Sequence, residues 1–510
     1  MAVDYLKVAQ ASDLQGRDRF LYRALETLPA ALSGGTLVAL TLLSWLKPAG
    51  VAYFIIVFDV YWLLLVLFLI LHLISAYRTL TKNKTINWQA KCQAISGWQE
   101  VRHLVILPVY NESKDIITAS LRALIDDGYP VDKLMVVLAV EERAGEEQLH
   151  SCRRIESEFK DKFGYWLLTA HPDGIAGELK GKGANQAWAA RAAQREIIDK
   201  ASIDYAKILV SVFDIDTVVG GGYFWRLTHA FLTVPDPHHS SYQPIPVYHN
   251  NLWEAPWFAR VSAYSNTFWQ MMQQVREEKL ATYSSHSMTW QALVDIDFWA
   301  TNMVSEDSRI FWHCFCHYRG RYRVEPLYFP VSMDACMDKN KWKTIGNLYK
   351  QQRRWGWGAE NLPYLIFNVS KRWQTIDKKN ALGRILVQLY GFHAWATNAI
   401  IIGVIGWLPL FVGGENFNAT VLSGNLPFIT RTLMTLAMAG LVLSAVISMF
   451  LLPRRPARYG IGKTAVMVMQ WIFLPIIIII FGALPALEAQ VRLALGGKWR
   501  LGFWVTPKER

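Results

Sequence analysis

The long apolar runs of this chain constrain its fold more than any other feature. Five stretches carry few charges: they begin at Leu28 and Val51 and cover roughly 385–412, 428–452 and 464–487. Each approaches or exceeds the ~20 residues that an α-helix needs to cross about 30 Å of hydrocarbon. A charged segment precedes the first run and a second run follows it directly, which is not the pattern of a cleavable signal peptide. We therefore predict an integral membrane protein.

Basic residues beside these runs orient the chain. They precede the first run and follow the second: Lys7, Arg17, Arg19, Arg23, Arg78, Lys82, Lys84 and Lys91. Since cytoplasmic flanks are rich in lysine and arginine, we expect residues 78–380 and 453–463 in the cytoplasm. If all three later runs crossed the membrane, the basic C-terminal tail would lie on the side opposite the cytoplasm. Either the last run, interrupted by Pro475 and Pro485, does not cross fully, which we favour, or the charge rule fails there.

Short apolar runs alternate with helical patterns between the second and third membrane segments. Four runs are almost continuously apolar and rich in β-branched residues: 103–110, 133–140, 165–170 and 207–216. Segments of helical period follow the first, second and third of them: 113–127, 144–160 and 183–199. Such strands are typical of parallel sheets buried on both faces. We predict an α/β domain with a mostly parallel, doubly wound sheet, inserted between transmembrane helices, with its ligand at the carboxyl ends of the strands.

Acidic residues stand at three of these strand ends. Glu112 follows the first strand, Glu141 and Glu142 the second, and Asp214 and Asp216 the fourth. Any one of them alone could be a helix cap or a turn residue. Several carboxylates at one edge would repel one another without a counter-ion. A pair two residues apart offers oxygen ligands to Mg²⁺ or Mn²⁺, which commonly share their coordination shell with substrate phosphates.

Two further segments carry candidate polar groups. Lys180 and Lys182 lie in a glycine-flanked loop that opens a helix, a setting that favours phosphate. Ser305 predicts a helix N-cap, with Glu306 and Asp307 in the first turn, where the helix dipole favours ionised carboxylates. Ordinary capping is one interpretation of this pair. The other is a carboxylate that accepts a proton from an attacking hydroxyl.

The segment QQRRWGWGAE, residues 351–360, sets two arginines against two tryptophans. It predicts a site for an anionic and flat ligand, or an anchor at the membrane interface. We favour the ligand site for Arg354 and Trp355 and the anchor for Arg353 and Trp357. The net charge of +12 suits an anionic leaflet or phosphorylated substrates. No basic block or nucleic-acid-binding module appears, so nucleic acid is not an expected partner.

In this order, the motifs resemble those of the membrane-bound family 2 glycosyltransferases, the group that contains cellulose, chitin and hyaluronan synthases. They are Pro108–Glu112, Glu141, Asp214/Asp216, Glu306/Asp307 and Gln351/Arg354/Trp355. The resemblance covers roughly residues 100–370. The family more often has an aspartate at the position of Glu141, so Glu142 stays an alternative there.

The resemblance implies a role for each matched residue. The donor nucleotide would contact Pro108, Tyr110, Glu112, Glu141, Lys182 and Asp214. A metal ion, Mg²⁺ or Mn²⁺, would bind Asp216 together with Asp214. Asp307 would be the general base, with Glu306 beside it. Gln351, Arg354 and Trp355 would hold the diphosphate and the acceptor, and Ser285 and His286 are further acceptor candidates.

The expected protein is an inverting, processive hexosyltransferase in the plasma (inner) membrane. It would extend a glycan from a nucleotide-diphosphate sugar, UDP-linked or else GDP-linked, and pass the product through its own spans. We expect a cytoplasmic segment (1–27), two transmembrane helices (28–77), a cytoplasmic transferase domain ending in interfacial helices (78–380), about three transmembrane segments (381–490) and a tail (491–510). Transfer of one sugar to a polyprenyl phosphate or other lipid is the nearest alternative. A non-catalytic transporter or receptor is another, but it leaves the ordered acidic residues unexplained.

Overall fold

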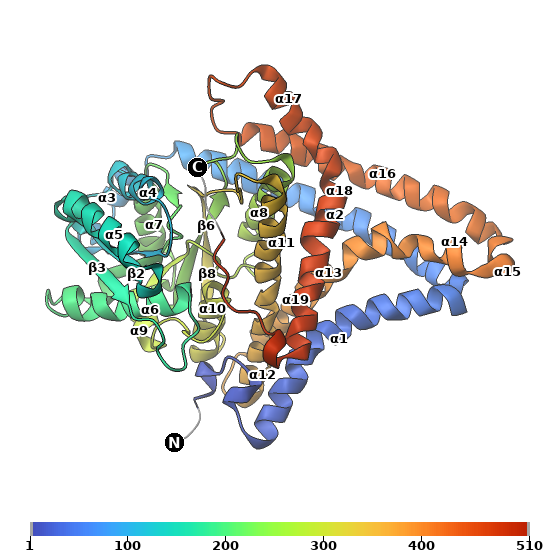
Figure 1. The fold of residues 1–510 in the computed structure, drawn as a ribbon, viewed down its shortest axis with the longest axis horizontal. Helices are drawn as coiled ribbons and strands as arrows, with labels where there is room; N and C mark the ends of the chain where they lie inside the picture. The colour runs from blue at the N-terminus through green and yellow to red at the C-terminus, as the bar shows by residue number, and fades with distance from the viewer. Residues whose placement is uncertain (1–3, 507–510) are drawn as a thin grey trace.

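The structure, a computed structural model, describes residues 4–506 and contains a mixed eight-stranded sheet (Figure 1). The strands are β1 Arg102–Val109, β2 Leu134–Glu141, β3 Tyr165–His171, β4 Ile208–Val212, β5 Val218–Val219, β6 Ser240–Val247, β7 Ser287–Thr289 and β8 Arg323–Ser332. Their order is β3-β2-β1-β4-β7-β6-β8-β5, and β1 to β4 pair in parallel. The carboxyl ends of β1, β2 and β4 therefore meet at one edge of the sheet.

Helices cover both faces of the sheet. One face packs against α3 (Trp88–Gln93), α4 (Lys114–Asp126), α5 (Glu146–Phe159) and α7 (Tyr223–Thr233). The other packs against α6 (Lys182–Ala193), α9 (Trp290–Asp295), α10 (Glu306–His317) and α12 (Asn361–Lys371). Every residue of β2 is buried, as expected for a central parallel strand. The predicted α/β architecture between long apolar helices is confirmed.

Within residues 4–506, five helical segments are long and apolar enough to cross a membrane. They are α1 Gly16–Leu46, α2 Pro48–Thr85, α13 Lys378–Gly403, α16 Val421–Phe450 and the composite segment Ile461–Leu495. In Figure 1, α1, α2 and α16 extend away from the sheet toward a common tip beside α14 (Leu408–Val412) and α15 (Gly414–Asn418). The apolar run 385–412 is therefore not one helix, since α13 ends at Gly403.

The composite segment returns to the α/β domain at both ends. It consists of α17 (Ile461–Met469), α18 (Leu474–Ile478) and α19 (Leu484–Leu495), joined by the short 3₁₀ helix η12 (Gln470–Phe473) and the short π-helix η13 (Ile479–Ala483). Before it, Arg458 forms an ion pair with Glu254 of the domain. After it, Arg500 forms ion pairs with Glu26 and Glu360. In Figure 1 the segment runs at an angle to α1 and α16 and lies alongside α11 (Lys341–Gly356). Its helix α19 contacts α11.

Two further elements complete the domain. Helix α8 (Trp257–Gln274) contacts α2, and its residues share an apolar cluster with residues of α2, α16 and α17. The N-terminal segment before α1 packs on the domain, since Val8, Ala11 and Leu14 belong to the core around α10 and α12. The described parts of the expected segments 1–27 and 491–510 thus both contact the domain. Residues 1–3 and 507–510 lie outside the described part.

Candidate active site

A cavity of about 810 Å³ opens at the carboxyl ends of β1, β2 and β4. All the residues to which the family resemblance assigns a nucleotide, metal, base or diphosphate role line it: Pro108, Tyr110, Glu112, Glu141, Lys182, Asp214, Asp216, Glu306, Asp307, Gln351, Arg354 and Trp355. These residues come from distant parts of the sequence, and parallel strand ends and helix starts bring them together. The structure thus gathers the motif residues around one space.

The turn after β1 is held by its own acid. Glu112 Oε2 accepts hydrogen bonds from the backbone N–H groups of Tyr110 (2.8 Å) and Asn111 (3.1 Å). The Tyr110 ring faces Arg143, with the guanidinium carbon 4.3 Å from the ring centroid. Tyr110 thus lines the cavity with its ring against Arg143, and the Glu112 carboxylate holds the backbone of the turn.

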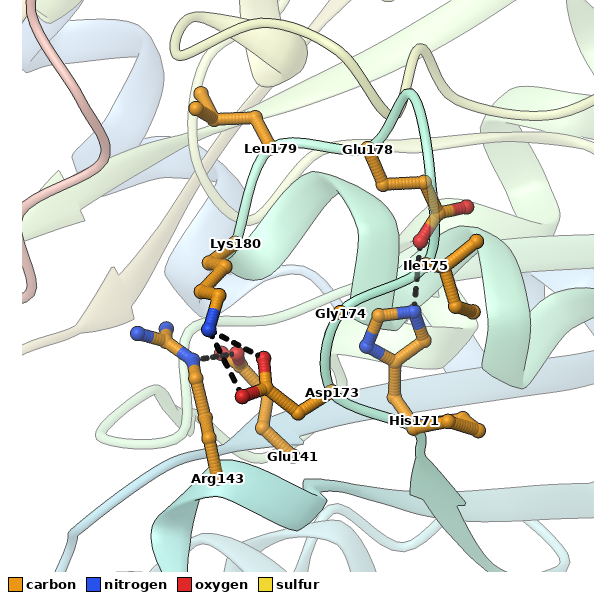
Figure 2. Close-up of a pocket in the computed structure, with 10 residues that line it drawn as sticks. Glu141, Arg143, His171, Asp173, Gly174, Ile175, Glu178, Leu179 and Lys180 are labelled. Atoms are coloured by element: carbon orange, nitrogen blue, oxygen red, sulfur yellow. Dashed lines mark hydrogen bonds and ion pairs between the residues drawn. The ribbon is translucent and has the colours of Figure 1, made fainter.

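A small hollow of about 80 Å³ adjoins the cavity at Glu141 (Figure 2). Two ion pairs rim it, Glu141 with Arg143 and Asp173 with Lys180 (2.7 Å), together with a hydrogen bond between His171 Nε2 and Glu178 Oε2 (2.9 Å). The hydrogen bond from Lys180 holds the pKa of Asp173 below its usual range. Of the two alternatives after β2, Glu141 lines the cavity, whereas Glu142 is exposed and accepts from the backbone N–H of Asp173.

Lys182 lies between two carboxylates at the first position of α6. Its Nζ is 2.8 Å from Asp214 Oδ1 and 2.9 Å from Asp307 Oδ2. Burial lowers the pKa of Lys182, but the neighbouring charges of Asp214, Asp307 and Glu306 raise it more, so the net shift is upward. The ammonium group thus stays charged and links the strand end of β4 to the first turn of α10.

The two aspartates after β4 have different surroundings. Asp214 Oδ2 accepts a hydrogen bond from Ser284 Oγ at 2.6 Å. Asp216 is buried, and its Oδ2 accepts from the backbone N–H of Asp334 at 2.9 Å. Asp334, which the sequence did not suggest, also lines the cavity.

These carboxylates fit a divalent metal only in part. Among residues 4–506 there is no group of three or more histidine, cysteine or acidic side chains placed to hold a metal ion. Oxygen donors on Asp214 and Asp216 suit Mg²⁺ or Mn²⁺, provided that water or substrate phosphates supply the remaining ligands. The donor set therefore fits a metal that binds together with a diphosphate.

The first turn of α10 carries one buried and one accessible acid. Burial and the nearby charge of Asp307 raise the pKa of Glu306 to about 8, against the effect of Lys182 and Arg354. Asp307 is partly exposed to the cavity, and its backbone carbonyl accepts a hydrogen bond from Thr282. Ser305 occupies the predicted N-cap position, but its hydroxyl does not cap the helix; it donates to Glu360 instead.

The QQRRW segment divides between the cavity and the scaffold. Gln351, Arg354 and Trp355 line the cavity, whereas Arg353 forms an ion pair with Glu488 of α19 at 2.6 Å. Trp357 is buried and packs under Arg500. The alternation follows helical geometry, because neighbouring residues of α11 point in different directions.

The two acceptor candidates, Ser285 and His286, do not line the cavity. Both are buried: Ser285 Oγ hydrogen-bonds Thr217 Oγ1 at 2.9 Å, and His286 Nδ1 lies 2.9 Å from the Tyr283 carbonyl oxygen. Ser284 lines the cavity in their place. The segment thus faces the cavity through Tyr283 and Ser284 and not through the two candidates.

The C-terminal tail forms part of the cavity wall, which the sequence analysis did not anticipate. Phe503, Val505 and Thr506 line the cavity. The Phe503 ring stands under the Arg354 guanidinium, 5.1 Å from its carbon, and against Gly181. A Cβ at Gly181 would meet the ring at 2.5 Å, and the backbone φ of +150° also favours glycine there. No local pattern signals a contact across more than three hundred residues.

Comparison with known proteins gives only distant likenesses. No family model and no curated protein sequence matches the chain. Among solved structures, it is similar to a mannosyltransferase from Pyrobaculum calidifontis in complex with GDP-Man and Mn²⁺ (16% identity, 75% of this chain, 99% of that one, TM-score 0.40). It is also similar to S. aureus TarS 1-349 in complex with UDP-GlcNAc (14%, 69%, 91%, 0.35) and to GalNAc-T7 with UDP, GalNAc and Mn²⁺ (9%, 57%, 57%, 0.33).

Proposed function

We propose that the protein is an inverting membrane glycosyltransferase that extends a glycan from a nucleotide-diphosphate sugar, and that it is processive. The observation that carries this proposal is the continuity of the cavity. Besides the carboxylates, Lys182 and Arg354, it is lined by residues of three membrane helices and of the composite segment: Trp62 and Leu69 of α2, Trp395 and Asn398 of α13, Ser444 of α16 and Phe481 of η13. A product formed at Asp307 thus has a path into the membrane helices.

The reaction needs a base, a held leaving group and an acceptor platform. Asp307 accepts the proton of the acceptor hydroxyl as its oxygen forms a bond to the anomeric carbon. The bond from that carbon to the β-phosphate oxygen breaks, and the nucleoside diphosphate leaves. Attack from the face opposite the leaving group inverts the anomeric carbon. Trp355 offers an apolar face for the acceptor sugar.

Two cationic groups are available to offset the charge that the leaving group gains. Lys182 at the start of α6 and Arg354 on α11 both line the cavity. Asp214 and Asp216 would hold Mg²⁺ or Mn²⁺, which when bound offsets the charge of the diphosphate. The Glu141 side of the cavity would take the nucleoside, for which we favour uridine.

The membrane arrangement belongs to the same proposal. The ends of the composite segment 461–495 both contact the α/β domain, through Arg458 before it and Arg500 after it. We propose that α1, α2, α13 and α16 cross the plasma membrane while this segment lies along its cytoplasmic surface. The basic tail then stays on the cytoplasmic side, as the charge rule requires.

A second function is supported by the walls of the membrane part of the cavity. Leu65, Leu69, Val387, Ile477 and Ile478 line it with aliphatic side chains. Aliphatic walls suit a polyprenyl chain, so transfer of a single sugar to a lipid phosphate is the alternative. Accumulation of elongated product separates the two functions.

The deciding experiment is turnover of a panel of radiolabelled nucleotide sugars by the full chain in lipid, with Mg²⁺ or Mn²⁺ and after chelation. We expect high-molecular-weight label from one donor, lost on chelation. Asp307→Asn should lower turnover by about 10²- to 10⁴-fold, because the acceptor hydroxyl then has no base. Label confined to solvent-extractable lipid would favour the alternative, and an active Asp307→Asn variant would contradict the assignment of the base.

A further inference from the structure

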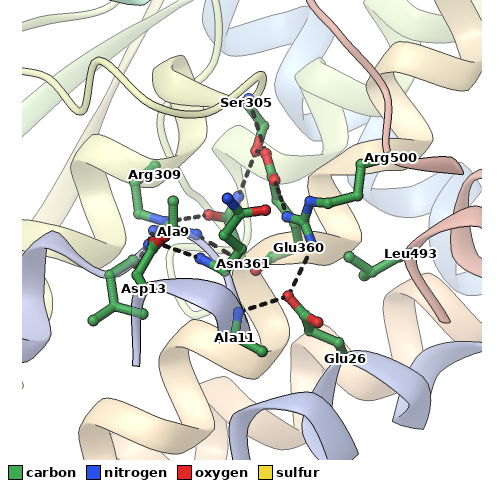
Figure 3. A network of polar contacts seen from close by, with 12 residues as sticks. Ala9, Ala11, Asp13, Glu26, Ser305, Arg309, Glu360, Asn361, Leu493 and Arg500 are labelled. Atoms are coloured by element: carbon green, nitrogen blue, oxygen red, sulfur yellow. Dashed lines mark hydrogen bonds and ion pairs between the residues drawn. The ribbon is translucent and has the colours of Figure 1, made fainter. Parts of the chain in front are cut away.

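A second charged cluster lies behind the first turn of α10 (Figure 3). It consists of Glu26 of α1, Glu360 of η10 (Trp357–Glu360) and Arg500 of the tail, and we call it the Arg500 clamp. Arg500 Nη1 is 2.8 Å from Glu26 Oε1, and Nη2 is 3.6 Å from Glu360 Oε2. Neither glutamate lines the cavity. The clamp therefore belongs to no substrate site described above.

Both carboxylates of the clamp are almost completely buried. Their side chains are only 3% (Glu26) and 2% (Glu360) exposed. Arg23 adds a second cation to Glu26 at 2.7 Å and also donates to the carbonyl groups that end α19. A buried charge whose partner is removed is strongly destabilising, so these groups hold one another firmly in place.

The other oxygen of Glu360 faces the first turn of α10. Glu360 Oε1 accepts hydrogen bonds from the backbone N–H of Ser305 (3.1 Å) and from its hydroxyl (2.6 Å). Ser305 immediately precedes Glu306 and Asp307. The position of Ser305 thus sets where α10 begins and hence where the Asp307 carboxylate points.

Neighbouring contacts make the same turn rigid from a second side. Asn361 donates to Ser308 Oγ (2.8 Å) and Ser305 Oγ (3.3 Å), and its side-chain oxygen accepts from Arg309 at 2.7 Å. Arg309 also donates to the Val8 carbonyl oxygen at 3.1 Å. The turn is therefore fastened to the N-terminal segment and to α12, and through Arg500 to the tail.

We propose that Glu360, fixed by Arg500, is a positioning residue: it holds Ser305 so that Asp307 meets the acceptor hydroxyl in the correct geometry. This inference rests on the proposed transferase function. A displacement of about 1 Å at a reacting group can cost roughly 100-fold in rate. Loss of the Glu360 contact is expected to act on kcat, because the residues expected to bind the nucleotide lie on other elements.

The test compares matched variants of the two carboxylates in the full chain. Glu360→Met and Glu26→Met each leave Arg500 with one glutamate, but only the first removes the acceptor for Ser305. We expect Glu360→Met to lower kcat by up to about 100-fold with little change in KM for the donor. Glu26→Met should retain kcat close to the wild type. Glu360→Gln keeps an acceptor oxygen and should restore most of kcat.

Hydrogen exchange of the peptide around Ser305 gives a readout that needs no turnover. We expect its amide to exchange faster in Glu360→Met than in Glu26→Met. If Glu360→Met does not fold, Ser305→Ala, which removes only the hydroxyl, should lower kcat by a smaller factor. Equal kcat and equal exchange in the two methionine variants would overturn the inference. An inactive wild type would instead count against the proposed function, while the exchange comparison would still decide the positioning role.

Discussion

Two of the charged clusters described above place one cation between two carboxylates, and they differ in what can reach them. In the cavity, Lys182 joins Asp214 and Asp307, whose side chains are each 23% exposed. In the clamp, Arg500 joins Glu26 and Glu360, whose side chains are 3% and 2% exposed. Similar charges can therefore serve as a site or as scaffold. A ligand in the cavity can reach the accessible carboxylates, whereas the buried ones are closed to it.

Removing each cation should separate the two clusters most clearly. Arg500→Met would leave buried Glu360 without a cation and buried Glu26 with Arg23 alone, and we expect a loss of about 3–5 kcal/mol in the free energy of unfolding. Lys182→Met should destabilise less, because water in the cavity solvates Asp214 and Asp307, but it should abolish sugar transfer. Thermal unfolding of both variants in the same detergent, with turnover measured in parallel, checks this. A larger loss of stability in Lys182→Met would reverse the comparison.

The pH dependence of stability sharpens the comparison at Glu306, a sealed acid at the border of the cavity. Its pKa is raised from 4.5 to about 8, chiefly by burial and by Asp307. As pH rises between these values, the unfolded chain loses this proton while the folded chain keeps it, so stability falls. Relative to Glu306→Gln, the wild type should lose up to about 1.4 kcal/mol per pH unit in this window. If the free energies of unfolding of the wild type and of Glu306→Gln change equally with pH, the pKa of Glu306 is not raised by burial.

The smallest expected effect concerns the wall that the tail gives to the cavity. Phe503→Ala removes the ring that supports Arg354, and we expect KM for the donor to rise about two- to fivefold. Trp504→Ala is the matched control, because Trp504 packs on Lys350 and does not line the cavity. Initial rates across donor concentrations measure both. If both variants change KM for the donor equally, the contact between Phe503 and Arg354 has no specific effect on donor binding.

The sequence predicts the first half of the sheet well and the second half poorly. Strands β1 to β4 are apolar, and β1, β2 and β4 are buried along nearly all their length, so composition alone identifies them. Strands β6 and β8 contain Pro244, Pro246, Pro326 and Pro330, residues that argue against a strand. β6 and β8 nevertheless pair in parallel, with a register shift between Gln243 and Ile245. Tertiary contacts impose this pairing, and no local sequence pattern specifies it.

The same distinction holds for the candidate site. Residues such as Asp214 and Asp307 follow a strand end or open a helix, so short motifs locate them. Phe503 and Glu360 reach their positions only through contacts between distant segments, and no spacing rule relates them to Asp307. Ser285 shows a finer limit: its φ of +63° belongs to a turn whose direction the sequence does not reveal, so the hydroxyl facing the cavity is that of Ser284.

The bond between Glu26 and Arg500 also bears on how the protein is made. The two residues are 474 positions apart, so the ribosome releases Glu26 long before it adds its partner. During that interval Glu26 can pair only with Arg23, three residues earlier on α1, and the second cation of the clamp is missing. The nascent chain therefore cannot complete the Arg500 clamp until translation has passed Arg500, so the support behind the first turn of α10 forms only after all five long apolar segments have been made.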